Sequence, residues 1–250
     1  MLVGERRDLL LTRLAADGKV LAKDVAAELG VSEDSIRRDL RDLAAAGLCQ
    51  RVYGGALPVS PAVADYASRT DIAKDGKARV ANAAAALVRP GSTVILDGGT
   101  TTLAVAKALP EDLEATVVTH SPTVAVALLD HRGIEVFLLG GRLFRHSAVT
   151  CGAAAAEAAQ AVTADLFLLG VTGVQHEAGL TTGDAEEAAM KRTLARRAAE
   201  TYVLASAEKI GAVSRFAVLP LSAVTGILTD APPEHPELGR LHAAGAPLIR

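Results

Sequence analysis

The chain has 250 residues, which is long enough for one large domain or for two of ordinary size. Half of the residues are apolar and 22% are charged, so the composition excludes a disordered or collagen-like chain. The formal net charge of −3 gives no overall sign of a nucleic-acid partner, although a small DNA-binding unit needs only a local positive patch. Aromatic residues make up 3% of the chain, which argues against single-strand binding by stacked rings.

Cysteines, histidines and the N-terminal segment exclude several further classes. Cys49 and Cys151 lie far apart, so they predict free thiols and not a disulfide framework. The six histidines are scattered, with no two inside one helical turn, so we expect no metal site. The first ten residues carry charges where a signal peptide needs an apolar run, and no stretch of about 18 apolar residues is found. We therefore expect a cytoplasmic protein that does not enter a membrane.

The composition changes near residue 58 and predicts two domains of an α/β protein. Residues 1–57 contain short amphipathic helical patterns, and residues 58–74, which begin with Pro58, are expected to form a linker. Over residues 75–250, helical stretches alternate with short β-branched runs, which is typical of βαβ units and a mostly parallel sheet. The predicted strands of this second domain cover residues 93–96, 116–119, 134–139, 166–169, 201–204 and 224–228.

The first 57 residues predict a helix-turn-helix. Apolar stripes run over residues 4–16 and 23–29, and these helices are expected to end at Gly18 and Gly30. A third helix is expected to begin after Ser32 as its N-cap and to stop at Gly47. Two short helices joined through a Gly-Val-Ser turn form the arrangement of a helix-turn-helix.

The outer face of the third helix suits a DNA major groove. On a helical wheel, Arg38 and Arg41 point away from the buried stripe, where guanidinium groups can pair phosphates or read guanine. Residues 48–57 then predict a β-hairpin wing that places a further arginine near a phosphate. The residues expected to contact DNA are Ser32, Ser35, Arg37, Arg38, Arg41, Arg51, Tyr53 and Gly54.

A second interpretation of this face stays open. Residues 1–57 contain nine basic and nine acidic residues, so the unit is neutral overall. A solvated helical face with salt bridges between residues four apart fits the same pattern.

Loops rich in glycine and hydroxyl groups follow the predicted strands of the second domain. After the strand over residues 93–96 comes the run DGGTTT and then a helix, so backbone amides, hydroxyls and a helix start can bind a phosphate. An ordinary strand–helix loop also uses glycine, which leaves this interpretation open. The carboxyl ends of parallel strands line one crevice, so the other loops are expected to converge there. The expected effector site contains Asp97, Gly99, Thr100, Thr101, Ser121, Gly140, Gly141, Arg142, Gly170 and Lys209.

Two other features of the second domain favour structural roles. The glycine-rich loop lacks the spacing of ATP-binding and NAD-binding motifs, so no cofactor is expected. On the helix predicted over residues 186–199, Lys191 and Arg192 are expected on a solvated face. Glu186 and Glu187 are expected to cap the start of that helix.

The first domain resembles a known family. Residues 31–40 read VSEDSIRRDL and residues 51–56 read RVYGGA, which is similar to the winged helix-turn-helix of the DeoR family of bacterial regulators. Ser35 stands where the family has Thr, which keeps the hydroxyl, and Tyr53 stands where it has His, which keeps a polar ring. The resemblance implies that double-stranded operator DNA is a partner.

The resemblance continues over almost the whole chain. The runs DGGTT (97–101), THS (119–121), LGG (139–141), DLFLLG (165–170) and KIG (209–211) are similar in order and spacing to the effector-sensing domain of the family. This implies a fold like those of ribose-5-phosphate isomerases and CoA transferases, and a phosphorylated sugar or related metabolite as effector. His120 stands where the family usually has Asn, and Ser206 where it usually has Asp. Both are expected to bear on ligand choice, and His120 is expected to make binding pH-sensitive.

A transcriptional regulator is favoured over an enzyme. In the similar isomerases an acidic loop follows the strand that corresponds to residues 166–169, whereas here the loop is Gly-Val-Thr-Gly and contains no acid. We therefore expect no catalytic residue and a homo-oligomeric repressor of carbohydrate-metabolism genes, controlled by a phosphorylated sugar. The alternative is an isomerase-like metabolic enzyme with a helical interaction appendage.

Overall fold

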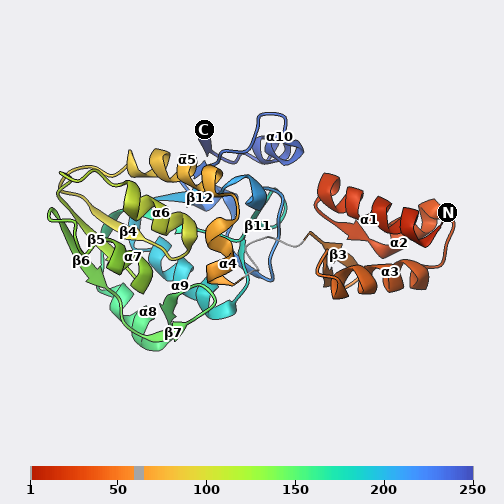
Figure 1. Ribbon diagram of the computed structural model, residues 1–250, viewed down its shortest axis with the longest axis horizontal. Coiled ribbons are helices and arrows are strands. Elements are labelled where there is room, and N and C mark those ends of the chain that lie inside the picture. The colour runs from red at the N-terminus through yellow and green to blue at the C-terminus, as the bar shows by residue number, and fades with distance from the viewer. Residues whose placement is uncertain (1, 59–64, 250) are drawn as a thin grey trace.

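The structure, a computed structural model, describes residues 2–58 and 65–249. A small head domain (residues 2–58) precedes a larger α/β domain (residues 65–249), and the two form separate lobes in Figure 1.

The head domain packs helices against a small antiparallel sheet. Ser32 is the N-cap of its third helix, as expected, and its hydroxyl accepts a hydrogen bond from the amide of Ser35 at 3.3 Å. Gly18 and Gly30 end the first two helices in left-handed conformations, which confirms both expected stops. The elements are α1 (Val3–Asp17), β1 (Val20–Leu21), α2 (Ala22–Leu29), α3 (Glu33–Ala45), β2 (Gln50–Val52) and β3 (Gly55–Leu57), with strand order β1-β3-β2.

A buried carboxylate fastens α1 to α3 in the head domain. The apolar core includes Leu10, Ile36 and Leu40, as the helical periodicity predicts. Asp39 is also buried on α3, and it accepts a hydrogen bond from Nε of Arg6 at 2.5 Å. This ion pair joins residues 33 positions apart, so no local pattern reveals it.

A seven-stranded parallel sheet forms the centre of the α/β domain. Its strand order is β15-β14-β12-β9-β4-β5-β6, and every neighbouring pair runs parallel. Six of the strands lie where the sequence predicts them, with shifts of one to three residues at the ends. Their bounds are β4 (Thr93–Leu96), β5 (Ala115–Thr119), β6 (Ile134–Leu138), β9 (Ala164–Gly170), β12 (Ala198–Leu204), β14 (Gly226–Leu228) and β15 (Leu248–Ile249).

Helices cover both faces of this sheet (Figure 1). Successive side chains of a strand point to opposite faces, so Val94 and Leu96 pack into one core cluster and Ile95 into the other. The first cluster contains side chains of α5 (Lys74–Ala85), α6 (Thr100–Ala108) and α7 (Pro122–Ala127). The second contains side chains of α8 (Ala153–Gln160), α9 (Ala185–Ala195) and α10 (Pro236–Ala243). Because both faces are covered, the strands are apolar without alternation.

Several elements were not predicted from the sequence. A helix, α4 (Tyr66–Asp71), lies within the expected linker 58–74 and packs on α6. The hairpin of β7 (Arg142–Phe144) and β8 (Val149–Cys151) follows the edge strand β6. A second sheet joins β10 (Gly173–Gln175), β11 (Gly179–Thr182) and β13 (Phe216–Leu219).

A few polar contacts join the two domains. Lys19 of the head pairs with Glu177, and Asp17 lies 3.7 Å from the guanidinium of Arg240 on α10. These side chains are largely exposed, so the contacts contribute little to stability.

Candidate functional site

The order of the strands in the large sheet reverses between β4 and β9. From β4 the chain continues outward through β5 and β6, and it then returns to β9 on the other side of β4. Such a switch point leaves a crevice beyond the carboxyl ends of the two strands. A cavity of about 30 Å³ lies there, with Gly98 and Gly99 after β4 and Gly170 at the end of β9 in its wall. We call it the switch-point cavity.

The backbone at the start of α6 suits an anion. Gly99 precedes this helix with a φ of +111°, a conformation that favours glycine. No described side chain caps α6, and its first helical hydrogen bond is donated by the amide of Leu103 to the carbonyl of Gly99. The amides of the first turn are thus without helical partners, beside the cavity residues Thr100 and Thr101. The helix start adds a partial positive charge.

Four buried cationic side chains line the switch-point cavity. Lys191 is 2% exposed, Lys77 is 5% exposed, Lys209 is 6% exposed and Arg69 is 8% exposed. Two carboxylates, Glu187 and Glu208, also contribute to the wall. Positive charge is therefore in excess around a space that is largely shielded from water.

Three of these cations donate hydrogen bonds to neutral oxygens only, within the described part of the chain. Lys209 Nζ lies 3.1 Å from the Thr101 hydroxyl and 3.3 Å from the carbonyl of Leu204. Lys77 Nζ donates to the carbonyl of Arg69 at 2.5 Å, and Arg69 Nη2 donates to that of His146 at 2.6 Å. Buried charges are normally paired with opposite charges, so this arrangement suits an anion.

Burial governs the ionisation of these cations. Burial lowers the pKa of Lys209 to about 8. Neighbouring cations such as Lys77 also lower this pKa, whereas the negative charge of Glu208 raises it. Burial also lowers the pKa values of Lys77 and Arg69. A bound anion would favour the charged form of all three groups.

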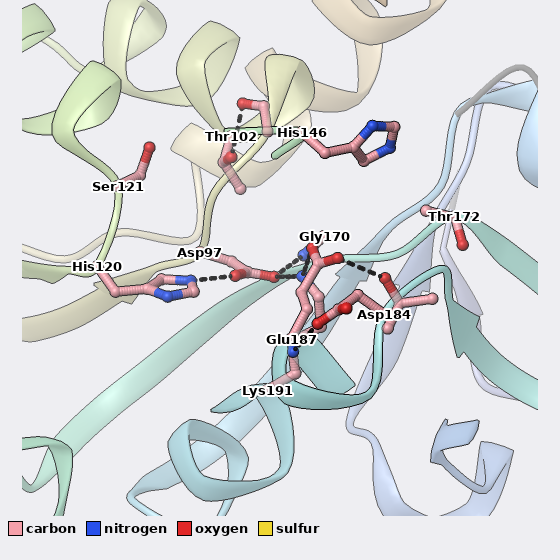
Figure 2. Close-up of polar contacts among 12 residues, drawn as sticks. Asp97, Thr102, His120, Ser121, His146, Gly170, Thr172, Asp184, Glu187 and Lys191 are labelled. Carbon is pink, nitrogen blue, oxygen red and sulfur yellow. Dashed lines mark hydrogen bonds and ion pairs between the residues drawn. The ribbon is translucent and has the colours of Figure 1, made fainter. Parts of the chain in front are cut away.

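Asp97 lies behind the cavity wall and is fully buried. Its carboxylate accepts hydrogen bonds from Lys191 Nζ at 2.5 Å, His120 Nε2 at 2.7 Å and the amide of Gly170 at 2.9 Å, and Figure 2 shows it between the first two side chains. Burial by itself raises the pKa of Asp97, but the charges of Lys191 and His120 outweigh it and hold that pKa well below its usual range. Burial likewise opposes ionisation of Lys191, whose pKa is nevertheless raised by Asp97 and Glu187.

His120 is part of this network and not of the cavity lining. Its Nδ1 lies 2.9 Å from the carbonyl of Thr150, while Nε2 faces the Asp97 carboxylate. Both partners are acceptors, so both hydrogen bonds form only when both ring nitrogens carry protons. Lys191 lies between the two carboxylates of Asp97 and Glu187.

Five of the ten predicted effector residues line the cavity: Gly99, Thr100, Thr101, Gly170 and Lys209. The other five do not. Asp97 is buried in the network, and Ser121 donates a hydrogen bond to the carbonyl of Ala148. Gly140, Gly141 and Arg142 follow the edge strand β6, and Arg142 pairs with Glu186 at the surface.

Several lining residues escaped the sequence analysis. The expected solvated position of Lys191 is wrong, because Asp97 and Glu187 surround it in the interior. The expected capping role of Glu187 is also wrong, because Asp184 caps α9 and accepts hydrogen bonds from the amides of Glu186 and Glu187. Glu187 is buried between Lys191 at 3.3 Å and the hydroxyl of Thr182 at 3.0 Å. The remaining unpredicted lining residues that carry polar side chains include Arg69, Lys77, Ser147 and Glu208.

The predicted DNA-contacting residues lie on the surface of the head domain. Arg38 and Arg41 are exposed on α3 opposite its buried stripe, while Arg37 lies 2.7 Å from Glu33. Tyr53 is fully exposed at the tip of the wing. Arg51 is exposed and lines a larger cavity, about 570 Å³, between the head and the α/β domain. The other predicted positions, Ser32, Ser35 and Gly54, are exposed or half-buried.

Comparison with known proteins identifies the family. The chain matches the family profile of the DeoR-like helix-turn-helix domain over residues 6–62 and that of the DeoR C terminal sensor domain over residues 72–231. It belongs to the DeoR family of transcriptional regulators. The chain is 31% identical to the HTH-type transcriptional regulator GlpR of Haloferax volcanii, over 100% of this chain and 98% of that protein. It is also 31% identical to the HTH-type transcriptional repressor GlcR of Bacillus subtilis, over 98% and 95% of the two chains.

The family assignment confirms the predicted resemblance, and the α/β domain is the DeoR sensor domain. Among solved structures, ribose 5-phosphate isomerase A of Methanocaldococcus jannaschii matches with a TM-score of 0.39 and 18% identity, over 52% of this chain and 51% of that chain. None of the helices in the described ranges has the length and apolar character needed to cross a membrane. Within the same ranges, His, Cys, Asp and Glu side chains do not gather into a group of three or more suited to a metal ion.

Breaking the ion pair between Asp97 and Lys191 is expected to destabilise the sensor domain. Each single variant, Asp97→Asn or Lys191→Met, leaves a buried charge without its main partner and is expected to cost about 3–5 kcal/mol of unfolding free energy. The double variant is expected to cost less than the sum of the two. Urea unfolding of the wild type, the two single variants and the double variant measures this coupling. If the losses of unfolding free energy in the single variants added up to that of the double variant, the two residues would not interact.

Replacing Lys209 by Met is expected to stabilise the ligand-free protein near pH 7, by on the order of 2 kcal/mol. The pKa of Lys209 is about 8 in the fold and 10.5 for a lysine in water, so the unfolded chain binds the proton more tightly. Wild-type stability should therefore rise between about pH 8 and pH 10, and the variant should lack this rise. Thermal unfolding across this pH range measures the difference, with the exposed Lys107→Met variant as control. If the stability of Lys209→Met depended on pH in the same way as that of Lys107→Met, the charged state assigned to Lys209 would be contradicted.

Proposed function

We propose that this DeoR-family protein represses genes of carbohydrate metabolism and that a phosphorylated sugar in the switch-point cavity controls its release from operator DNA. The observation that carries this proposal is the set of buried cations Arg69, Lys77 and Lys209, which have no carboxylate among their hydrogen-bond partners. A phosphate monoester bears about two negative charges at neutral pH and has three strong acceptor oxygens. It therefore supplies the charge and the acceptors that these donors lack.

The helix start and the neighbouring hydroxyls support the same ligand class. Thr100 and Thr101 lie at the first turn of α6, where unpaired amides favour phosphate. Elsewhere in the wall, the carboxylate of Glu208 offers only acceptors. Its oxygen Oε2 is buried and has no hydrogen-bond partner among the described atoms. A sugar hydroxyl can donate to such an oxygen. The cavity thus offers donors for a phosphate and an acceptor for a polyol.

The names of the relatives agree with this ligand class. The glycerol-3-phosphate regulon repressor of Escherichia coli K12 is 29% identical to the chain over 92% of this chain and 91% of that protein. GlcR is likewise named as a transcriptional repressor. These names support repression and a phosphorylated metabolite here.

A regulator without catalysis is supported by the side chains of the cavity. The loop after β9 contributes Gly170, Val171 and Thr172, none of which can act as a carboxylate base. Of the two carboxylates in the cavity wall, Glu187 has both oxygens engaged, one by Lys191 and one by Thr182. Its position is therefore explained by the charge balance around Asp97.

We also propose that the protein acts in the cytoplasm as a homo-oligomer. One head presents one recognition helix, α3, and can read only one half-site. Two heads related by a two-fold axis read two half-sites and reach a useful specificity. Sedimentation equilibrium of the purified chain measures the subunit number, and a monomer that binds its operator with full affinity would contradict this arrangement.

A panel of sugar phosphates is expected to stabilise the protein and to release it from DNA. Ribose 5-phosphate, fructose 6-phosphate, glucose 6-phosphate and glycerol 3-phosphate are tested against the matching unphosphorylated compounds. A ligand at 100 times its Kd adds about 2.7 kcal/mol to the unfolding free energy and raises the melting temperature. Fluorescence anisotropy of a duplex selected from a random library by the wild-type protein measures release.

Two results would overturn the proposed function. The first is equal stabilisation by the phosphorylated and unphosphorylated compounds, which would remove the phosphate from recognition. The second is turnover of ribose 5-phosphate that disappears in Glu187→Gln, which would make the protein an isomerase.

Replacing Arg38 by Ala is expected to weaken operator binding by about 1–3 kcal/mol if the guanidinium contacts a base. The arginine is exposed on α3 and forms no ion pair with another described residue, so it is available to DNA. Anisotropy titrations at several salt concentrations measure the effect and separate base contacts from phosphate contacts. Arg132→Ala, an exposed arginine in the sensor domain, is the matched control. Equal affinity of both variants would exclude Arg38 from the interface.

A further inference from the structure

Arg69 occupies an unusual position between the two domains. It lies on α4, the first helix that follows the head domain along the described chain. Its side chain is 8% exposed and lines the switch-point cavity, although residues 58–74 were expected to be a linker only. The residue therefore belongs both to the cavity and to the segment that leads to the DNA-binding head.

The guanidinium of Arg69 is only partly satisfied. Nη2 donates to the carbonyl of His146 at 2.6 Å, and the ring of Tyr66 lies 5.8 Å from Cζ. Nε is buried and has no hydrogen-bond partner among the described atoms. An unpartnered donor of a buried charged group is costly, and a fork of donors fits an oxygen anion. The unused donor and the cavity together indicate where such an anion would bind.

The cavity is small, so we expect a ligand to widen it on binding. Its volume of about 30 Å³ is room for one or two water molecules, whereas a sugar phosphate is several times larger. One side of the cavity is the sheet edge with Gly98 and Gly170, which the Asp97 network holds in place. The other side is formed by Arg69 on α4 and by Ser147 in the turn between β7 and β8.

The side formed by α4 is held by hydrogen bonds to neutral oxygens, and none of the ion pairs among the described residues involves it. Tyr66 exchanges a hydrogen bond of 2.9 Å with Thr123, and Lys77 donates to the carbonyl of Arg69 at 2.5 Å. The bond from Arg69 to the carbonyl of His146 connects α4 to the β7–β8 turn. His146 in turn lines the larger cavity that faces Arg51 of the wing. A shift of α4 therefore reaches the cavity beside the wing through this turn.

We propose that Arg69 binds the phosphate of the effector through its free donors, so that an occupied cavity fixes α4 in a new position and passes the signal to the DNA-binding head. This inference rests on the proposed function, because it names the residue by which that effector acts. Arg69 is thus both a ligand-binding residue and a coupling residue.

A purely structural role for Arg69 makes the opposite prediction about stability. If the residue only ties α4 to His146, then Arg69→Gln should lower the melting temperature of the ligand-free protein. If it is an anion ligand, removing an uncompensated buried charge leaves that melting temperature equal or higher and abolishes stabilisation by phosphates. Ligand-free stability therefore separates the two roles.

The experiment compares wild-type protein with Arg69→Gln, Arg69→Lys and the surface control Arg132→Gln. Each full-length protein is titrated with inorganic phosphate, ribose 5-phosphate, fructose 6-phosphate and glycerol 3-phosphate, with and without the selected duplex. The readouts are the melting temperature, the Kd of the tightest probe and the ratio of its Kd values with and without duplex. This ratio measures the coupling between the two sites.

Arg69→Gln is expected to weaken the tightest probe by about 10- to 100-fold while the ligand-free melting temperature does not fall. Arg69→Lys keeps the charge and is expected to retain binding, but its compact ammonium cannot span a phosphate and the His146 carbonyl. The ratio of Kd values, expected at about 5 to 150 in wild type, should fall toward 1 in this variant. Arg132→Gln should match wild type in all three readouts.

Three results would overturn the inference. Unchanged probe affinity in Arg69→Gln would remove Arg69 from the binding site while the proposed function stands. A wild-type ratio retained in Arg69→Lys despite binding would exclude coupling through this residue. Failure of every probe to bind the wild-type protein would overturn the proposed effector class and this inference with it.

Discussion

The buried carboxylate of Asp97 is the group on which the sensor site depends. It accepts hydrogen bonds from three separate elements: the amide of Gly170 at the end of β9, Lys191 on α9 and His120 after β5. One side chain thereby fixes the relative positions of the elements that border the switch point. Displacing any of them would remove a donor from a buried charge, at a cost of about 1–3 kcal/mol or more. We therefore expect the sheet side of the cavity to stay fixed and the side formed by α4 and the β7–β8 turn to move when a ligand binds.

We propose that the cations of the cavity serve binding and not the stability of the protein. Lys191 has two carboxylate neighbours, but Lys77, Lys209 and Arg69 rely on hydroxyl and carbonyl oxygens. Burial disfavours the ionised forms more strongly than the nearby carboxylates Glu187 and Glu208 favour them, which explains the lowered pKa of all three. A dianion would remove this penalty and would add hydrogen bonds that water in so small a space cannot supply. The free energy lost in the empty state is thus available as affinity for a phosphate.

The parts of the fold that local sequence determines were predictable, and the site was only partly so. Helix stops at Gly18 and Gly30, the cap at Ser32 and the strand at residues 93–96 depend on neighbours within a few positions. Lys191 was misplaced because its partner Asp97 is 94 positions away, and Arg69 was missed because its segment read as a linker.

Strand order explains the misplaced loop residues. Loops after all the strands were expected to converge, but of the predicted residues only those that follow or end β4, β9 and β12 line the cavity. The loop that contains Gly140 follows β6, which lies two strands from β4 and so about 10 Å from the crevice. Strand order depends on the packing of the whole domain, and a single sequence does not reveal it.

Charge in the head domain makes DNA binding sensitive to the placement of the heads. Asp39 and Asp42 engage Arg6 and Arg7, and Glu28 engages Arg13, so much of the positive charge is already neutralised within the domain. The exposed arginines of α3 and the wing form a small patch on a neutral unit. Because affinity grows with the number of phosphates contacted, a single head is expected to bind weakly, and in the proposed homo-oligomer the spacing between paired heads would control the total. In that arrangement a small displacement of each head would weaken operator binding, since both half-sites must be contacted together.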